Sequence, residues 1–121
     1  MVNQIEFHPY LQQDVLIGAC RHLGVQVMAH CPLGRAGTLF DEPVVVAAGV
    51  AHGKSPAQVV LRWHVQQGVI PIPGSTNARR LAENIDVFDF ALSEDEMAAI
   101  SGLSARPYRI CEPPVPFEFD P

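Results

Sequence analysis

The alternation of short apolar segments with helical patterns constrains this chain more than any other feature. Three apolar segments, at residues 2–7, 25–29 and 69–73, have the length of buried strands and are rich in β-branched residues. Between them, apolar residues recur at helical spacing, first over residues 11–23 and then over two further stretches. Strands that alternate with helices imply right-handed crossover connections and a parallel sheet. The sequence therefore predicts an α/β fold.

Local capping signals set the ends of the predicted helices. A serine followed three residues later by Gln or Glu forms a capping box, and Ser55 with Gln58 and Ser93 with Glu96 both fit this pattern. Asn77 is a third candidate cap. The predicted helices comprise residues 11–23, residues 43–52 closed by Gly53, residues 56–67 before Gly68, residues 78–85, and a stretch from 94 to near Gly102, while the segment from Leu33 to Thr38 is predicted to be a loop.

Three parallel strands make an incomplete sheet. Such a sheet has two open edges, and parallel sheets are normally covered on both faces. The 121 residues of the chain suffice for one domain with a buried core, but not for two. A complete (β/α)8 barrel takes ~250 residues. The pattern therefore predicts part of a larger structure, and the proline-rich stretch at residues 104–121 is predicted to lack regular structure.

Charge and composition argue against several classes of function. Lys plus Arg number 8 and Asp plus Glu 13, and the net charge of −5 argues against nucleic-acid binding, which requires a basic surface. No apolar run approaches the ~20 residues that span a bilayer, and no secretory signal is recognisable. Three widely spaced cysteines and five scattered histidines suggest neither a disulfide framework nor a metal site. We expect a cytoplasmic protein without membrane, metal or nucleic-acid partners.

The turn before the helix at residues 78–85 is the strongest candidate binding site. Ser75 and Thr76 supply hydroxyl groups, and Arg79 and Arg80 supply guanidinium groups. A helix N-terminus adds unpaired N–H groups and partial positive charge, so the combination suits a phosphate. Ordinary capping by Asn77 beside two solvated arginines explains the same residues equally well.

Other polar residues have both a binding and a structural interpretation. The His30 imidazole, at the end of a strand, could stack on a planar ligand, or it could be a satisfied strand-end histidine. The Gln4 amide suits a ligand carboxamide, although structural hydrogen bonding is the more common role. Glu83 and Asn84 could reach the edge of a base or could form a solvated helix face.

Two aromatic residues are expected to pack rather than to react. Trp63 shares a helical face with Val59 and Val60, which is typical of a core residue. Tyr10 lies just past the first predicted strand, and Lys54, the only lysine, is distant in sequence. Tyr10 is therefore predicted to be a packing or rim residue and not a proton donor.

Taken in order, the motifs of this chain closely resemble those of the aldo-keto reductase family. The resemblance extends from residue 2 to about residue 103. It implies a TIM barrel of which this chain supplies strands six, seven and eight with their helices over residues 1–103, followed by the C-terminal loop at residues 104–121. The matching segments are residues 2–10 (VNQIEFHPY), 32–34 (PLG), 54–63 (KSPAQVVLRW), 69–76 (VIPIPGST), 80–84 (RLAEN) and 86–90 (DVFDF).

The resemblance also implies a binding site for NADPH in an extended conformation. The residues that match cofactor contacts are Gln4 for the nicotinamide carboxamide, His30 where the family usually stacks Tyr or Trp on the nicotinamide ring, Leu33 and Gly34 near the pyrophosphate, Ser75 with Thr76 and Arg80 at the 2′-phosphate, and Glu83 and Asn84 at the adenine. Many members carry a lysine where this chain has Gly74. That difference weakens the preference for NADPH and makes NADH possible.

The catalytic residues of the family belong to the half of the barrel that this chain does not contain. The resemblance therefore assigns no catalytic residue here, and we expect a truncated reductase that is inactive alone. Combined with the missing half, it would reduce a small aldehyde or ketone. The alternative is a non-catalytic remnant that binds a nucleotide or associates with itself through its open sheet edges.

Overall fold

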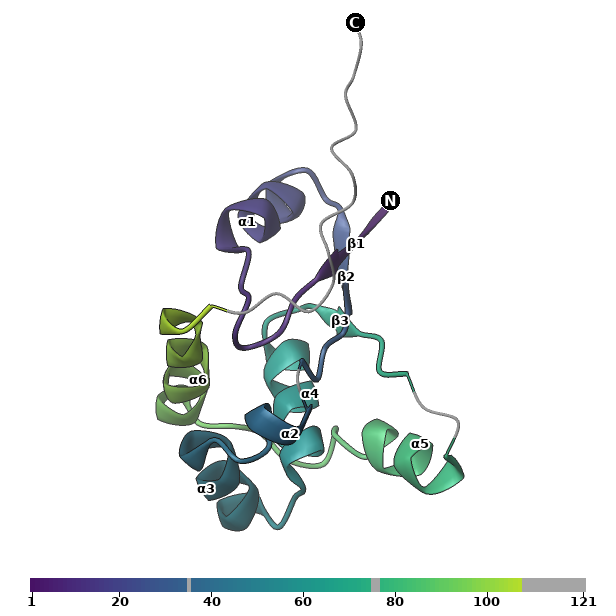
Figure 1. Ribbon diagram of the computed structural model, residues 1–121. Coiled ribbons are helices and arrows are strands. Elements are labelled where there is room, and N and C mark those ends of the chain that lie inside the picture. Colours follow the sequence, from purple (N-terminus) through teal and green to yellow (C-terminus); the bar gives the residue numbers. More distant parts are fainter. Residues whose placement is uncertain (35, 75–76, 108–121) are drawn as a thin grey trace, which may run out of the picture.

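The computed structural model describes residues 1–34, 36–74 and 77–107. Strands and helices alternate along this part of the chain (Figure 1), as the apolar pattern predicts. The elements are β1 (Val2–Glu6), α1 (Asp14–His22), β2 (Gln26–His30), α2 (Ala36–Leu39), α3 (Pro43–His52), α4 (Pro56–Gln66), β3 (Ile70–Pro71), α5 (Ala78–Ile85), α6 (Glu94–Ser101) and the 3-10 helix η1 (Gly102–Ala105).

The three strands form a parallel sheet in the order β1-β2-β3, which confirms the predicted α/β class. Strand β2 pairs with β1 along its whole length, from Gln26 opposite Val2 to His30 opposite Glu6. Its pairing with β3 covers only two positions, although a strand over residues 69–73 was predicted. Proline has no N–H group to donate to a ladder, so Pro71 and Pro73 explain why this strand is short.

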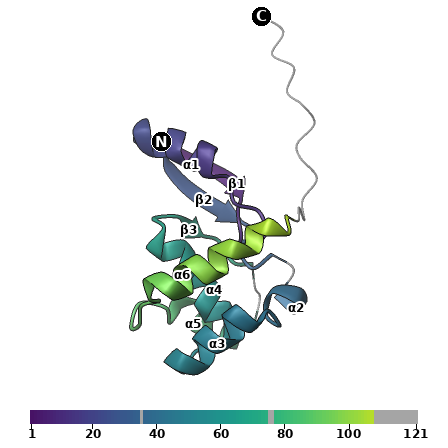
Figure 2. The ribbon, with the colours of Figure 1, turned by 90° about the vertical axis from the view of Figure 1, so that its left-hand side faces the viewer.

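Among the described residues, helices cover one face of the sheet and leave the other open. Helices α1, α4 and α6 lie on the same side of the strands (Figures 1 and 2). The strand residues Ile5, Val27 and Ala29 are buried. Residues that alternate with them point to the opposite face, where Gln4 is exposed and Ile70 retains 46% of its accessible surface. This face combines polar residues such as Gln4 with apolar ones such as Ile70, and part of a larger α/β structure would expose such a face.

A cluster of rings joins β1, α4 and α6 in the core. Trp63 is fully buried and stacks on Phe7, with ring centroids 5.3 Å apart. The imidazole of His64 meets both rings edge-on. The indole N–H of Trp63 donates to Oγ of Ser101 at 3.0 Å. The prediction that Trp63 is a core residue is confirmed.

Most helix ends agree with the capping signals, but the helix predicted over residues 11–23 begins only at Asp14, and two further segments differ. Helix α3 has the predicted bounds and ends at Gly53, whose φ of 65° suits glycine. The segment from Leu33 to Thr38 was predicted to be a loop, but it includes the start of α2. Helix α6 ends at Ser101 as expected, but the chain continues as η1. Residues 108–121 of the proline-rich stretch lie outside the described residues.

Within the described ranges, no single helix is long and apolar enough to cross a membrane. Helices α3 and α4 reach the required length and apolar character only when they are taken together, and the chain bends by 92° between them.

Candidate functional site

A cavity of about 470 Å³ lies where β2 and β3 end. Its walls come from the turn after β2, from the segments after α2 and β3, and from helices α4 and α5. In parallel α/β structures, ligands bind at the carboxyl ends of the strands. The lining residues are Cys31, Pro32, Leu33, Gly34, Phe40, Ala57, Pro73, Gly74, Arg80, Glu83 and Asn84.

The turn after β2 is tight and depends on glycine. The backbone N–H of Gly34 donates to the carbonyl of Cys31 at 3.0 Å. Both residues have positive φ, 51° at Cys31 and 55° at Gly34. A β-carbon at residue 34 would lie 3.4 Å from the ring of His8. The positive φ favours glycine at residue 34, whereas the distance to His8 is an ordinary van der Waals contact.

A buried pair of polar side chains, His8 and Glu6, lies next to this turn. His8, which packs against Gly34, is fully buried, and its Nε2 lies 3.2 Å from Oε1 of Glu6. Glu6 is the last residue of β1 and pairs in register with His30 of β2. The end of β1 thus fixes the turn that follows β2.

The opposite wall is the face of helix α5 that carries Arg80. The side chain of Asn77 caps this helix, because its Oδ1 accepts the backbone N–H groups of Arg79 at 2.9 Å and Arg80 at 3.3 Å. The predicted capping role of Asn77 is confirmed. Arg80 lines the cavity and its neighbour Arg79 does not. Capping and anion binding are compatible here, because the arginine side chain is separate from the capped backbone.

Lys54 is held away from the cavity. Its Nζ lies 2.8 Å from Oδ1 of Asp89 and 3.4 Å from Oδ2 of Asp86, and 5.2 Å from the centre of the Phe90 ring. The hydrogen bond to Asp89 raises the pKa of Lys54, although its loss of hydration opposes that effect. Among the described residues that line the cavity, Arg80 therefore supplies the cationic group.

The structure brings together some of the predicted cofactor residues and not others. Gln4 is exposed on the open face of the sheet, and the half-buried His30 ends β2 immediately before the cavity wall. Neither residue lines the cavity. Ser75 and Thr76 lie outside the described residues. The predicted residues that share the cavity are Leu33, Gly34, Arg80, Glu83 and Asn84.

The sequence analysis missed other parts of the wall. Phe40 follows the unpredicted helix α2, and no local signal marks it. Ala57 lies in the first turn of α4, directly after the capping residue Ser55 and Pro56. The capping box located that turn, but a small side chain gave no reason to assign it to a binding site.

Comparison with known proteins shows which proteins this chain is similar to. The Aldo/keto reductase family profile matches residues 1–105. The chain is 44% identical over 119 residues to the uncharacterized oxidoreductase YtbE of Bacillus subtilis, covering 98% of this chain and 42% of that protein. It is 46% identical over 112 residues to aldo-keto reductase family 1 member A1 of Mus musculus (85% of this chain, 34% of that protein). It is also 46% identical to the morphine 6-dehydrogenase of Pseudomonas putida, over 114 residues (84% and 38%).

Solved structures also superimpose on this chain. The crystal structure of Gox0644 in its apo form superimposes with a TM-score of 0.86 at 40% identity, covering 92% of this chain and 41% of that one. A Gox0644 variant in complex with NADPH superimposes with a TM-score of 0.79 at 43% identity, covering 84% of this chain and 37% of that one. The chain therefore spans about two-fifths of the length of the relatives that it matches. From its sequence and its fold alike, this chain belongs to the aldo/keto reductase family.

Proposed function

We propose that this chain is the cofactor-binding part of an NADPH-dependent aldo-keto reductase and contributes strands six to eight of a TIM barrel. One observation carries the proposal: a single cavity is lined by Leu33, Gly34, Arg80, Glu83 and Asn84. These residues come from two separate segments of the chain, and the family resemblance implies a cofactor contact for each. The NADPH complex of a relative with 43% identity supports the choice of cofactor.

The polar groups of the cavity suit the adenosine end of NADP(H). A guanidinium group such as that of Arg80 binds phosphate through paired, charge-assisted hydrogen bonds, so it would hold the 2′-phosphate. The carboxylate of Glu83 accepts hydrogen bonds and the amide of Asn84 both donates and accepts them, which matches the edge of adenine. Because Gly74 offers no second cation, discrimination against NADH would depend mainly on Arg80.

An extended cofactor would run from this cavity onto the open face of the sheet. His30 immediately precedes the cavity wall at Cys31, and Gln4 lies on the open face of the neighbouring strand. In this proposal His30 stacks on the nicotinamide ring and Gln4 binds its carboxamide. Bound NADPH supplies the hydride for reduction of a carbonyl group. The residues of this chain bind and orient the cofactor, and the proton donor comes from outside the chain.

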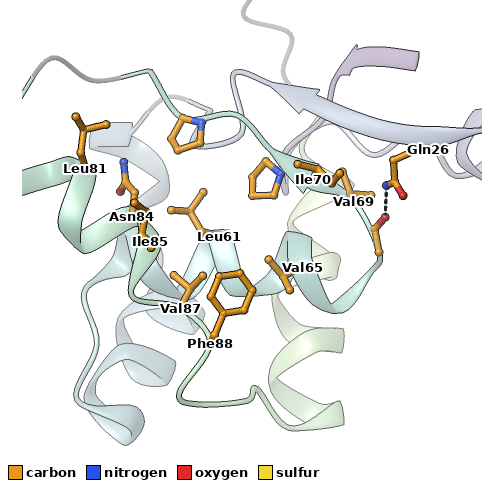
Figure 3. A pocket seen from close by; sticks show the side chains of 13 residues that line it. Gln26, Leu61, Val65, Val69, Ile70, Leu81, Asn84, Ile85, Val87 and Phe88 are labelled. Atoms are coloured by element: carbon orange, nitrogen blue, oxygen red, sulfur yellow. Dashed lines mark hydrogen bonds between the residues drawn. The ribbon is translucent and has the colours of Figure 1, made fainter. Parts of the chain in front are cut away.

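The exposed apolar surface beside β3 supports an incomplete barrel. A second cavity, of about 500 Å³, lies between α4, β3 and α5 (Figure 3), with apolar walls that include Leu61 and Leu81. Phe88, at its rim, keeps 72% of its accessible surface. We propose that the rest of the reductase covers this surface. Mixing the chain with that missing half should restore reduction of a simple aldehyde by NADPH, and activity no greater than that of either half alone would contradict this part of the proposal.

Self-association through the edge of β3 is the less favoured alternative. The backbone N–H of Ile72 donates to the carbonyl of Ala29 in β2, at 2.9 Å. Backbone groups alternate along an extended strand, so those of Pro71 point to the outer edge, where proline has no N–H to offer. A second copy would therefore find an edge that accepts hydrogen bonds but donates few. Sedimentation as a monomer would exclude the alternative.

Titration of the chain with NADPH, followed by nicotinamide fluorescence, tests the proposed cofactor site. Arg80→Ala should weaken binding roughly tenfold to a hundredfold, the range expected for hydrogen bonds to a charged group. Arg79→Ala is the matched control, because this neighbour carries the same charge on the same helix but does not line the cavity. Equal losses in the two variants, or no binding by the unaltered chain, would contradict the proposal.

A further inference from the structure

The hydroxyl group of Ser55 lies at the junction of two helices beside the cavity. Its oxygen caps α4 by accepting the backbone N–H of Gln58 at 3.2 Å, and the Gln58 side chain accepts the backbone N–H of Ser55 at 3.0 Å. The same hydroxyl donates to Oε1 of Glu83 in α5. A hydroxyl group has a single hydrogen, so these partners fix its orientation. Ser55 thus serves both the start of α4 and the wall of the cavity.

Gln58 also joins α4 to α5 through hydrogen bonds. Its amide nitrogen donates to the backbone carbonyls of Glu83 at 3.1 Å and of Asp86 at 3.2 Å, and the residue is almost completely buried. The Glu83 carbonyl also accepts the backbone N–H of Asp86 at 3.1 Å, so Gln58 adds a second donor at the C-terminal end of α5. Rotation of α5 would break these bonds. The helix that carries Glu83 is therefore fixed to α4 at the point where both border the cavity.

We propose that the Ser55 hydroxyl is a positioning group for the adenine end of the nucleotide and acts through Glu83. This inference rests on the cofactor site proposed above. A carboxylate has two oxygens, and because Ser55 engages Oε1 through a charge-assisted hydrogen bond, Oε2 is the acceptor that faces a ligand amino group such as that of adenine. Holding the carboxylate in place before binding reduces the side-chain entropy that binding would otherwise remove.

Capping and positioning require different chemical groups at residue 55, so substitutions can separate them. A helix cap needs only an acceptor, which serine, threonine and aspartate all provide. Positioning of Glu83 needs a donor, which aspartate lacks. Ser55→Thr keeps both groups, Ser55→Asp keeps the acceptor alone, and Ser55→Ala removes both.

The test is calorimetric titration of the full chain with adenosine 2′,5′-bisphosphate. Ser55→Asp and Ser55→Ala should each weaken binding roughly tenfold, whereas Ser55→Thr should stay within about twofold of the unaltered chain. In a Glu83→Ala background, Ser55→Asp should cause no further loss, because the group through which it acts is gone. In the Glu83→Ala background, thermal unfolding should change little on Ser55→Asp, because the cap is preserved and no second carboxylate faces residue 55.

The possible results separate this inference from the proposed function. Unchanged affinity in Ser55→Asp, a loss in Ser55→Thr as large as in Ser55→Ala, or full additivity with Glu83→Ala would each overturn the positioning role while the cofactor site stands. If the unaltered chain binds neither adenosine 2′,5′-bisphosphate nor NADPH, the proposed function fails, and the positioning role fails with it.

Discussion

Acidification should destabilise this fold through His64 of α4, which is fully buried against the end of β1. One ring nitrogen lies 2.8 Å from the carbonyl oxygen of Val60, and the other lies 3.0 Å from that of Phe7. Burial lowers the pKa of His64 from its ordinary 6.5 to about 4, with a smaller contribution in the same direction from His8. The two carbonyl contacts raise the pKa of His64, but by less than burial lowers it. The folded chain therefore keeps this imidazole neutral.

The direction and size of the effect follow from the two pKa values. Between pH 6.5 and pH 4 the unfolded chain binds a proton at residue 64 that the folded chain does not. The contribution to the free energy of unfolding is therefore complete above pH 6.5 and is lost as the pH falls toward 4. At about 1.4 kcal/mol per pH unit, the loss amounts to about 3 kcal/mol. That is a large part of the ~5–15 kcal/mol that stabilises a typical domain.

Urea unfolding provides the assay, because Trp63 is the single tryptophan and stacks in the same cluster as His64. The free energy of unfolding would be measured from pH 4.5 to pH 7.5 for the unaltered chain and for His64→Gln. The variant keeps a donor near the Phe7 carbonyl but does not titrate. We expect a steep pH dependence in the unaltered chain and a much flatter one in the variant. The same pH dependence in both would refute the reasoning.

Two further predictions concern the ends of β1 and β2. Burial, together with the hydrogen bond from the Tyr10 hydroxyl to Glu42 at 2.7 Å, raises the pKa of Tyr10 to about 12. The difference in ultraviolet titration between the unaltered chain and Tyr10→Phe should have its midpoint near pH 12, and the stability that Tyr10 contributes should be lost as the pH rises from 10 to 12. A midpoint near 10 would show that the contact is absent in solution. Gly34→Ala should lower the free energy of unfolding by about 1–2 kcal/mol for the cost of positive φ and should also weaken NADPH binding, because this strain falls in the turn that lines the cavity. Gly24→Ala is the control, since it has φ of 69° with open space around it, and equal NADPH affinities in the two variants would contradict the role given to the turn.

Features that depend on nearby residues could be predicted from the sequence. The bounds of α3 and α5 agree with Gly53 and Asn77, because a cap acts on a backbone only a few residues away. The parallel sheet followed from the alternation of strands and helices. The shortness of β3 was foreshadowed by its prolines, but the strand was still predicted too long.

Features that depend on tertiary packing could not be predicted. The bond from Ser55 to Glu83 joins residues 28 positions apart, and Arg106 meets the carboxylate of Glu42 across 64 positions. Neither pairing leaves a periodic signal in the chain. Within the candidate site, the family resemblance supplied residues from both walls, whereas Phe40 became visible only when the turn after α2 was placed against them. The assignments of Gln4 and His30 remain predictions.

The measurement that tests the central claim most directly is a series of ¹H–¹⁵N NMR spectra of the labelled chain during titration with NADPH. The account predicts that the amide signals that shift are concentrated in the turn at Leu33 and Gly34 and in α5 at Arg80, Glu83 and Asn84, while those of α1 stay in place. Shifts grouped instead around the apolar cavity beside Phe88, or no shifts at high NADPH concentration, would contradict it.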